Sequence, residues 1–204
     1  MKKICCFCGL NLATTKDHIP PKAIFNKPRP SDLITVPACH ECNHIASETD
    51  EKFKTYLGMQ VARYNSDGEK LFKEGVLSTI KKNAKLHRII FQSTKPVYTT
   101  TKAGIITGKA FTVQWENDVH DLTIERIIRG LFYHHYKKIL SKTVTIKTYW
   151  FNKAPIGYEE KLYSNSIAGG AFIYLYNLVD DSEFDSIWLF QFYGGHWAGG
   201  ITQS

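Results

Sequence analysis

The placement of the cysteines constrains the fold of this chain more than any other feature of the sequence. All five lie within the first 42 of the 204 residues, at Cys5, Cys6, Cys8, Cys39 and Cys42. Four of them form two C-x2-C pairs, Cys5 with Cys8 and Cys39 with Cys42, which 30 residues separate. Thiolates at this spacing can converge tetrahedrally on one Zn2+ ion at about 2.3 Å. We therefore predict a structural zinc site with these four ligands, and Cys6 is left over.

The redox state of these thiols depends on where the chain resides. The N-terminus, MKKICCFCG, has no apolar segment of the kind that a secretion signal needs. No apolar run approaches the roughly 20 residues of a membrane helix. We expect a soluble, cytoplasmic protein, in which clustered cysteines bind metal more often than they form disulfides. A redox dithiol or a set of buried free thiols is the alternative.

The charge of the chain is positive and unevenly distributed. With 26 Lys and Arg against 19 Asp and Glu, the formal charge is +7. It divides into +3 over residues 1–64, +8 over residues 65–178 and −4 over residues 179–204. A positive block of this size suits a polyanionic partner, because Lys and Arg displace counterions from phosphates. An ordinary solvated surface is the alternative.

The segment between the cysteine pairs, and the one after them, predict two strands and a helix. Ile19 precedes Pro20 and is therefore extended, which places Asp17-His18-Ile19 on a strand. The β-branched run Leu33–Val36 can return antiparallel to it. After Cys42, apolar residues recur at helical steps, at Phe53, Tyr56, Leu57, Val61 and Tyr64. The predicted order is strand, loop, strand, helix, held by zinc.

These features together resemble the zinc-knuckle HNH endonucleases, a family with the ββα-metal fold. The resemblance spans about residues 4–57 and rests on the first cysteine pair, on Asp17-His18-Ile19-Pro20 and on Cys39-x2-Cys42-Asn43. It implies a metal-dependent DNA endonuclease that hydrolyses phosphodiester bonds. Members of this kind act alone, in phages, or beside an ATPase partner in bacterial defence.

The resemblance also implies a role for each matching residue. His18 is the general base, and Asp17 and Asn43 are the ligands of a catalytic Mg2+ or Mn2+ ion. The Asn that braces the loop between the strands in this family aligns with Asp32, so the residue type differs there. We expect Lys22, Lys27 and Arg29 to contact phosphates at the rim of the site, and His44 to do so at the start of the helix.

The residue types suit this chemistry independently of the resemblance. Histidine, with an ordinary pKa of about 6.5, is partly neutral at pH 7 and can act as a base. Asp17 and Asn43 offer the oxygen ligands that Mg2+ prefers. Neighbours on a regular strand point to opposite faces, so a bend is expected at Asp17 and His18. A surface imidazole at His18, a helix N-cap at Asn43 and solvated loop cations are the alternatives.

A second motif occupies some of the same residues. His40-Glu41-Cys42-Asn43-His44 spells H-E-x-x-H, the signature of zinc metalloproteases, in which both histidines bind zinc from mid-helix. Here a cysteine knuckle would pass through those residues, and no clear third ligand follows. The metalloprotease is therefore the weaker alternative. A zinc-ribbon protein that binds or regulates nucleic acid without cleaving it is the other.

The remaining residues predict an α+β domain over residues 65–204 that contacts substrate or partner, with a soft boundary to the module of residues 1–64. We expect helices broken near Gly75, a β-meander over 97–116 and one long amphipathic helix over 123–140. Strands follow at 144–151, 171–178 and 186–192, and form an antiparallel sheet covered by the helix. Gly194-Gly195 and Gly199-Gly200 are interpreted as turns.

Other clusters in this part favour structural roles. His120 and His134-His135 lack acidic or thiol neighbours at ligand spacing, which is typical of core and surface histidines. The alternating aromatic residues over 172–193 fill a sheet more often than they stack bases. Lys81, Lys82, Lys85 and Arg88 are a plausible nucleic-acid face, although a solvated helix surface is the commoner explanation.

Overall fold

A computed structural model of the protein describes residues 3–155, 157 and 161–204. The helices are α1 (His40–Val61), α2 (Ser66–Lys70), η2 (Leu71–Val76, a π-helix), α3 (Leu77–Lys82), α4 (Ala84–Ser93) and α5 (Asn117–Tyr136), with 3-10 turns η1 (Lys22–Ile24) and η4 (Ala168–Gly170). The strands are β1 (Thr15–Ile19), β2 (Ile34–Ala38), β3 (Thr94–Thr100), β4 (Ile106–Val113), β5 (Thr145–Phe151), β6 (Tyr163–Ile167), β7 (Phe172–Leu178), β8 (Ser186–Phe192) and β9 (His196–Gln203).

The strands form three antiparallel sheets. β1 pairs with β2, β3 pairs with β4, and a five-stranded sheet has the order β5-β9-β8-β7-β6. The mixed α and β composition with antiparallel sheets is therefore confirmed. The predicted order of strand, strand and helix after the first cysteine pair is also what the structure has, as β1, β2 and α1. None of the helices in the described residues is long and apolar enough to cross a membrane.

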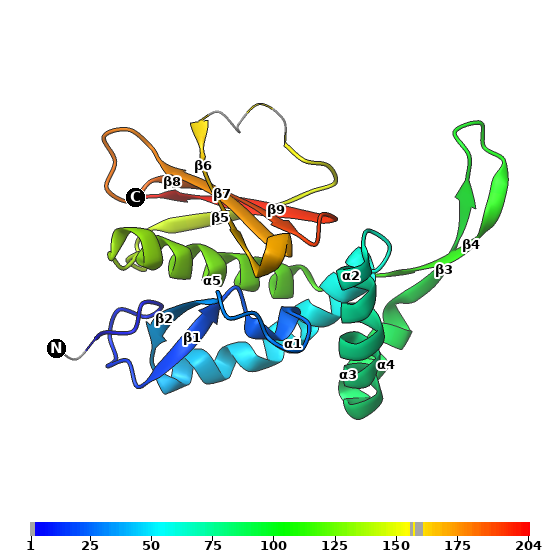
Figure 1. The fold of residues 1–204 in the computed structure, drawn as a ribbon, viewed down its shortest axis with the longest axis horizontal. Coiled ribbons are helices and arrows are strands. Elements are labelled where there is room, and N and C mark those ends of the chain that lie inside the picture. Colours follow the sequence, from blue (N-terminus) through cyan, green and yellow to red (C-terminus); the bar gives the residue numbers. More distant parts are fainter. Residues whose placement is uncertain (1–2, 156, 158–160) are drawn as a thin grey trace.

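Helix α5 lies between the five-stranded sheet and the N-terminal hairpin with α1 (Figure 1). On one side, a Cβ atom built at Gly130 would come within 2.5 Å of Cγ1 of Ile19 in β1. On the other side, Cδ1 of Ile128 lies 2.7 Å from the position of a Cβ atom at Gly200 in β9. The helix begins before residue 123, and it ends before residue 140 because Lys137 adopts a left-handed conformation with φ of 56°. It is buried on two sides rather than covering a sheet from outside.

One contiguous hydrophobic core joins the two halves of the chain. It contains Ile19, Phe53 and Leu57 from the first 64 residues, and Ile127 and Trp188 from the remainder. The boundary at residue 64 does not separate two cores. Division of the chain into folding units at that point stays a prediction.

Strand β9 lies inside the sheet, although the sequence predicts turns at its glycines. It pairs with both β5 and β8. A Cβ atom at Gly199 would come 2.3 Å from the carbonyl oxygen of Trp188, and one at Gly200 would come 2.6 Å from that of Lys147. These glycines therefore permit close approach of neighbouring strands, a known reason for glycine within a strand. The interpretation of Gly199-Gly200 as a turn is wrong.

The middle of the chain also differs from expectation. Helices α2, η2 and α3 run on without a break at Gly75, and the break falls at Asn83, whose Oδ1 accepts a hydrogen bond from the amide of Leu86 at 3.0 Å. This is an N-cap for α4. β3 and β4 form a single hairpin, not a meander, with its turn over residues 101–105. The hairpin projects from the body of the molecule (Figure 1).

Candidate functional site

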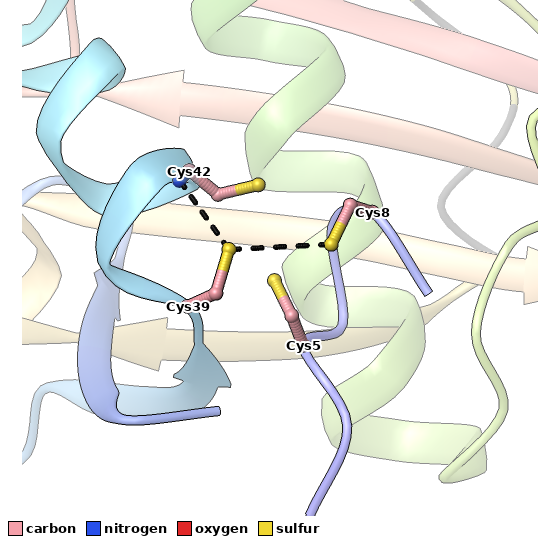
Figure 2. Close-up of side chains that lie close together, drawn as sticks. All are labelled: Cys5, Cys8, Cys39 and Cys42. Carbon is pink, nitrogen blue, oxygen red and sulfur yellow. Dashed lines mark hydrogen bonds between the residues drawn. The ribbon is translucent and has the colours of Figure 1, made fainter. Parts of the chain in front are cut away.

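Four of the five cysteines come together at the start of α1. The sulfur atoms of Cys5, Cys8, Cys39 and Cys42 all lie within 4.8 Å of one another (Figure 2). None is in a disulfide, and the Cys8 and Cys39 sulfurs are 4.0 Å apart. Four sulfurs at 2.3 Å from one tetrahedral ion would be about 3.8 Å apart. The predicted ligand set is confirmed as a cluster that could hold a metal ion.

Local backbone geometry brings each cysteine pair into place. At the first pair, the amide of Gly9 donates to the carbonyl of Cys5 at 3.0 Å, and Gly9 has a left-handed φ of 66° that closes the turn. At the second pair, Cys39 is the N-cap of α1, and its sulfur accepts from the amide of Cys42 at 3.5 Å. The helix start thus presents both sulfurs of the second pair to the first.

Cys6 does not belong to this cluster. Its side chain is fully buried in the hydrophobic core, and its amide donates to the carbonyl of Pro37 at 3.0 Å. Burial raises the pKa of the Cys6 thiol well above its ordinary value, which disfavours a thiolate. The prediction that Cys6 is left over is consistent with this position.

A cavity of about 240 Å³ lies beside the cysteine cluster, between β1, η1 and α1. Its lining includes three of the residues that the sequence singled out for catalysis, Asp17, His18 and Asn43, together with Lys22. The other lining residues are Lys16, Ala23, Ser47 and Asp50. A larger hollow of about 590 Å³ on the hairpin offers only Lys3 and Lys16 as titratable groups. The smaller cavity is therefore the candidate active site, because of the side chains that line it and not because of its size.

The carboxylate of Asp17 is held through one oxygen only. Nε of Arg126, from α5, donates to Oδ2 of Asp17 at 2.9 Å, and Nη2 donates to the same atom. Nη1 of Arg126 donates to the carbonyl of Cys42 at 2.8 Å. Within the described residues, Oδ1 of Asp17 accepts no hydrogen bond. The ion pair therefore orients Asp17 and leaves one oxygen available to a ligand in the cavity.

Asn43 is held in a similar way. Its Nδ2 donates to Oγ1 of Thr15 at 3.2 Å, and Thr15 in turn donates to the carbonyl of Ala38 at 2.9 Å. Its Oδ1 has no hydrogen-bond donor among the residues described. Since Cys39 is the N-cap of α1, the alternative role of Asn43 as an N-cap is wrong. Both Asp17 and Asn43 keep one oxygen free at the cavity.

His18 is half-buried at the cavity wall. Burial and the charge of Lys22 lower the pKa of its imidazole below the ordinary value, and Asp17 opposes this shift. A lowered pKa keeps the ring neutral at pH 7. The strand is regular here, because Asp17 pairs with Val36 and His18 with Thr35 without a shift in register. The expected bend at these residues is wrong, yet both side chains line the cavity.

Two residues of this site escaped the sequence analysis. Asp50 lies on α1 two turns after Asn43, and burial, with a contribution from the charge of Asp17, raises its pKa to about 7, while Arg126 opposes the rise. The spacing of Asn43, Ser47 and Asp50 places them on one helix face, a signal that could have found Asp50. Arg126 is 109 residues from Asp17, and no local pattern connects them.

The other predicted contacts lie elsewhere. The carboxylate of Asp32 is exposed and accepts from the amide of Ala168 at 2.9 Å, so it contacts the C-terminal part of the chain. Lys27 and Arg29 line a separate cavity of about 280 Å³. His44 is exposed, and its ring stacks on that of His40 with centroids 5.8 Å apart. Their roles stay predictions, and only Lys22 of the predicted cations lines the cavity with Asp17.

The H-E-x-x-H residues do not gather into a metal site. His40 is the first residue of α1, and the carboxylate of Glu41 accepts from Nδ2 of Asn11 at 3.0 Å. In the part of the chain that the structure describes, the four cysteines are the one group of three or more Cys, His, Asp or Glu ligands that converges. The sulfur atom of Cys42, between the two histidines, belongs to the four-cysteine cluster.

His120, His196 and His135 pack against other side chains in the C-terminal part of the chain. Nε2 of His120 lies 3.3 Å from Nε2 of His196, and both rings are buried. His135 lies between two tyrosine hydroxyls, at 3.0 Å from that of Tyr174 and 2.9 Å from that of Tyr176. Trp188 and the aromatic residues near it on β7 and β8 are also buried. These groups fill the sheet, as their sequence pattern predicts.

The geometry thus defines two adjacent sites with different chemistry. The cysteine cluster offers four soft ligands that surround one point. The cavity offers the carboxyl groups of Asp17 and Asp50, the amide oxygen of Asn43, the imidazole of His18 and the ammonium groups of Lys16 and Lys22. No protein-family model, curated protein or solved structure matches this chain.

Proposed function

We propose that the chain is a metal-dependent DNA endonuclease whose active site is the cavity between β1 and α1. The observation that carries the proposal is that Asp17, His18 and Asn43 line one cavity beside the four-cysteine cluster. Phosphodiester hydrolysis needs a base and a positive charge near the phosphate; His18 can act as the base, and Asp17 and Asn43 can hold a divalent cation. The resemblance to zinc-knuckle HNH endonucleases selects the same three residues.

Each side chain then has a role that its surroundings permit. His18 takes the proton of the attacking water, for which a neutral imidazole is required. Oδ1 of Asp17 and Oδ1 of Asn43 would hold a hard divalent cation, Mg2+ or Mn2+. Such an ion, when bound, stabilises negative charge on the scissile phosphate. Lys16 and Lys22 bind the remaining phosphate oxygens.

The cysteine cluster has a structural role in this proposal. Four thiolates suit Zn2+ and complete its coordination, so no position is left for water or substrate. The second cysteine pair immediately precedes Asn43, and the carbonyl of Cys42 accepts from Arg126. A zinc ion there would fix the start of α1, and with it the orientation of Asn43 and Arg126.

A second function is favoured by one specific contact. Arg126 neutralises Asp17 and occupies one of its oxygens. A lasting pair of this kind would suit a zinc-ribbon protein that binds nucleic acid without cleaving it. In that case the cavity would bind phosphate through Lys16 and Lys22, and no divalent cation would be needed.

Plasmid cleavage distinguishes these functions. Supercoiled DNA is incubated with the protein and Mg2+ or Mn2+, with and without a chelator, for wild type, His18→Ala and Asn43→Ala. We expect His18→Ala to lower the rate by about 100-fold or more, as is typical for loss of a general base. Zinc content and melting temperature should stay unchanged. Glu41→Gln is the matched control, since Glu41 lies next to the cysteine cluster but outside the cavity lining.

Each other result has a defined meaning. The endonuclease proposal would be overturned if the His18→Ala variant still cleaved the plasmid. It would also be overturned if the wild-type protein cleaved no plasmid with any of the metals. DNA binding without cleavage would support the non-cleaving protein. Peptide hydrolysis that depends on Glu41 would revive the metalloprotease.

A further inference from the structure

The net charge of the chain resides in a single segment. Residues 75–115, here called the basic arm, contain seven Lys and Arg and no Asp or Glu, which equals the formal charge of +7 for the whole chain. The rest of the chain has 26 − 7 = 19 basic and 19 acidic residues, so its charges cancel. The seven cations are Lys81, Lys82, Lys85, Arg88, Lys95, Lys102 and Lys109. We infer that the basic arm is a binding surface for duplex DNA.

Within the described residues, six of the seven cations of the basic arm are not neutralised by a carboxylate. All seven are exposed. Lys85 pairs with Glu48 at 3.0 Å, whereas the other six have no carboxylate within ion-pair distance among the described residues. Clustered like charges repel one another and destabilise the compact state. A polyanion relieves this repulsion, and each phosphate contact releases counterions.

The shape of the arm suits a nucleic-acid groove. Its hairpin, β3 with β4, forms a sheet of its own and projects from the body of the molecule (Figure 1). A two-stranded hairpin alone is marginally stable in water, so a projecting ribbon with most of its residues exposed is unusual. The major groove of B-DNA, about 12 Å wide, admits a two-stranded ribbon.

One face of the ribbon combines apolar and cationic side chains. The register places Phe111 opposite Pro96 and Lys109 opposite Tyr98, and the ammonium of Lys109 lies 5.9 Å from the ring centroid of Tyr98. Phe111 is 73% exposed and Tyr98 63%. Apolar side chains can contact thymine methyl groups while lysines contact phosphates. Pairing with the arm of a second copy would instead bring two segments of charge +7 together.

The arm is attached close to the cavity. Lys85 of α4 contacts Glu48 of α1, and Nδ2 of Asn83 donates to Oε2 of Glu51 at 3.0 Å. Ser47 and Asp50, on the same stretch of α1, line the cavity. A duplex held by α3, α4 and the hairpin would therefore pass near Asp17 and His18. The choice of DNA over RNA rests on the proposed function, whereas binding by the arm does not.

The test measures binding without cleavage. Fluorescence anisotropy follows a labelled 30-base-pair DNA duplex with the full chain, without added divalent cation, over a range of salt concentrations. The arm variant is Lys95→Ala/Lys102→Ala/Lys109→Ala. The matched control is Lys142→Ala/Lys147→Ala/Lys153→Ala, which removes the same charge from exposed lysines elsewhere. We expect the arm variant to raise Kd at least about 10-fold and to reduce the salt slope by about 2 to 3.

Several outcomes would overturn the inference. Equal weakening by the two triple variants would show that only net charge matters. Binding of a duplex RNA but not of DNA would remove the DNA assignment. If the chain self-associated in sedimentation equilibrium, and only the arm variant abolished this while DNA binding stayed unchanged, the arm would be a protein interface.

Two further measurements keep the result interpretable. The triple Lys→Arg variant at the same positions preserves charge and should bind as wild type does, and melting temperature and zinc content check the fold of each variant. If wild type binds DNA through the arm but does not cleave plasmid, the endonuclease proposal fails and the arm stands. If cleavage depends on His18 but the arm variant and its matched control bind DNA equally, the inference about the arm is wrong and the endonuclease proposal stands.

Discussion

The cysteine cluster lies where the N-terminal cysteine pair meets the start of α1, and the neighbouring cavity is lined by β1, η1 and α1; the two sites differ in how their ligands are held. The four sulfurs lie within 4.8 Å of one another and face a common point. In the cavity, Asp17 and Asn43 each use one polar atom to bind the protein and leave the other unpaired. Ligands that already converge suit a permanent structural ion. Ligands that keep one polar atom unpaired suit a site that must exchange water and substrate.

A single side chain connects these two sites. The guanidinium of Arg126 contacts the carboxylate of Asp17 at the cavity and the carbonyl of Cys42 at the cluster, and it lies 4.3 Å from the ring centroid of Phe7. Its side chain is only 13% exposed. Helix α5 therefore supplies the cation that orients Asp17 and that also holds the start of α1 at Cys42.

The largest expected effect is that of Cys39→Ser. Cys39 is both a member of the cluster and the N-cap of α1. Structural zinc contributes on the order of 10 kcal/mol in small zinc-binding peptides, so the variant should lose stoichiometric zinc and melt more than about 10 °C lower. Elemental analysis and thermal unfolding measure this. Cys6→Ala is the control and should keep its zinc; loss of zinc in both would break the assignment of four ligands.

The next effect in size is that of Arg126→Met. It leaves the buried carboxylate of Asp17 without its partner, which is expected to cost about 3 kcal/mol in the free energy of unfolding. Affinity for Mn2+ should fall by about 10-fold, as it does when a residue that orients a ligand is removed. Denaturant unfolding and Mn2+ titration measure the two effects.

A double-mutant cycle sharpens this prediction. Asp17→Asn combined with Arg126→Met should cost less than the sum of the two single changes, because the pair is already broken. Tighter Mn2+ binding in Arg126→Met would contradict the orienting role and favour the non-cleaving protein, in which Arg126 blocks the cation.

A smaller effect is expected from acidification. Burial, with the neighbouring His120, lowers the pKa of His196 to about 3, and burial also lowers that of His120. Between pH 6.5 and about 3 the unfolded chain binds more protons at His196 than the folded chain does, so stability falls as pH falls through this window. The slope is at most about 1.4 kcal/mol per pH unit for each histidine.

This pH effect arises away from both candidate sites. Unfolding by denaturant between pH 7 and pH 5 should be less pH-dependent in His196→Phe than in wild type, with zinc retained over that range. An unchanged slope in the variant would assign the acid sensitivity to the cysteine cluster instead, since zinc release follows protonation of thiolates.

The smallest expected effect is that of Asp32→Ala. Its carboxylate is exposed and, among the described residues, accepts one hydrogen bond, from the amide of Ala168, so stability should fall by less than about 1 kcal/mol. Plasmid cleavage should change by less than about 2-fold, because Asp32 does not line the cavity. A loss of cleavage above about 10-fold would show that Asp32 braces the site, and the cavity would then extend further than its lining suggests.

Short-range patterns in the sequence predict much of the N-terminal part correctly. The C-x2-C spacing predicts the cysteine cluster, because two close pairs leave few ways to arrange four thiolates. Pro20 and the β-branched run after Asp32 predict β1 and β2, and apolar periodicity predicts α1. These elements depend on residues close together in the chain, where local sterics and hydrophobic spacing decide the conformation.

Longer-range features escape such patterns. Gly199 and Gly200 read as a turn, but the approach of neighbouring strands places them inside the sheet. Asp50 lines the cavity with Asn43 from the same face of α1, but nothing in the local sequence shows that this face borders a cavity. The seven cations of the basic arm are visible in the sequence, whereas their exposure on a projecting ribbon is not.

The sequence by itself determined the ligand set of the cysteine cluster, the order of β1, β2 and α1, and the location of the net charge. Only the tertiary structure decided that Asp17, His18 and Asn43 share a cavity with Asp50, and that Arg126 holds Asp17 from 109 residues away. The physical reason is that α5 packs between the sheet and the hairpin, so its Arg126 meets Asp17 only after long-range burial is complete.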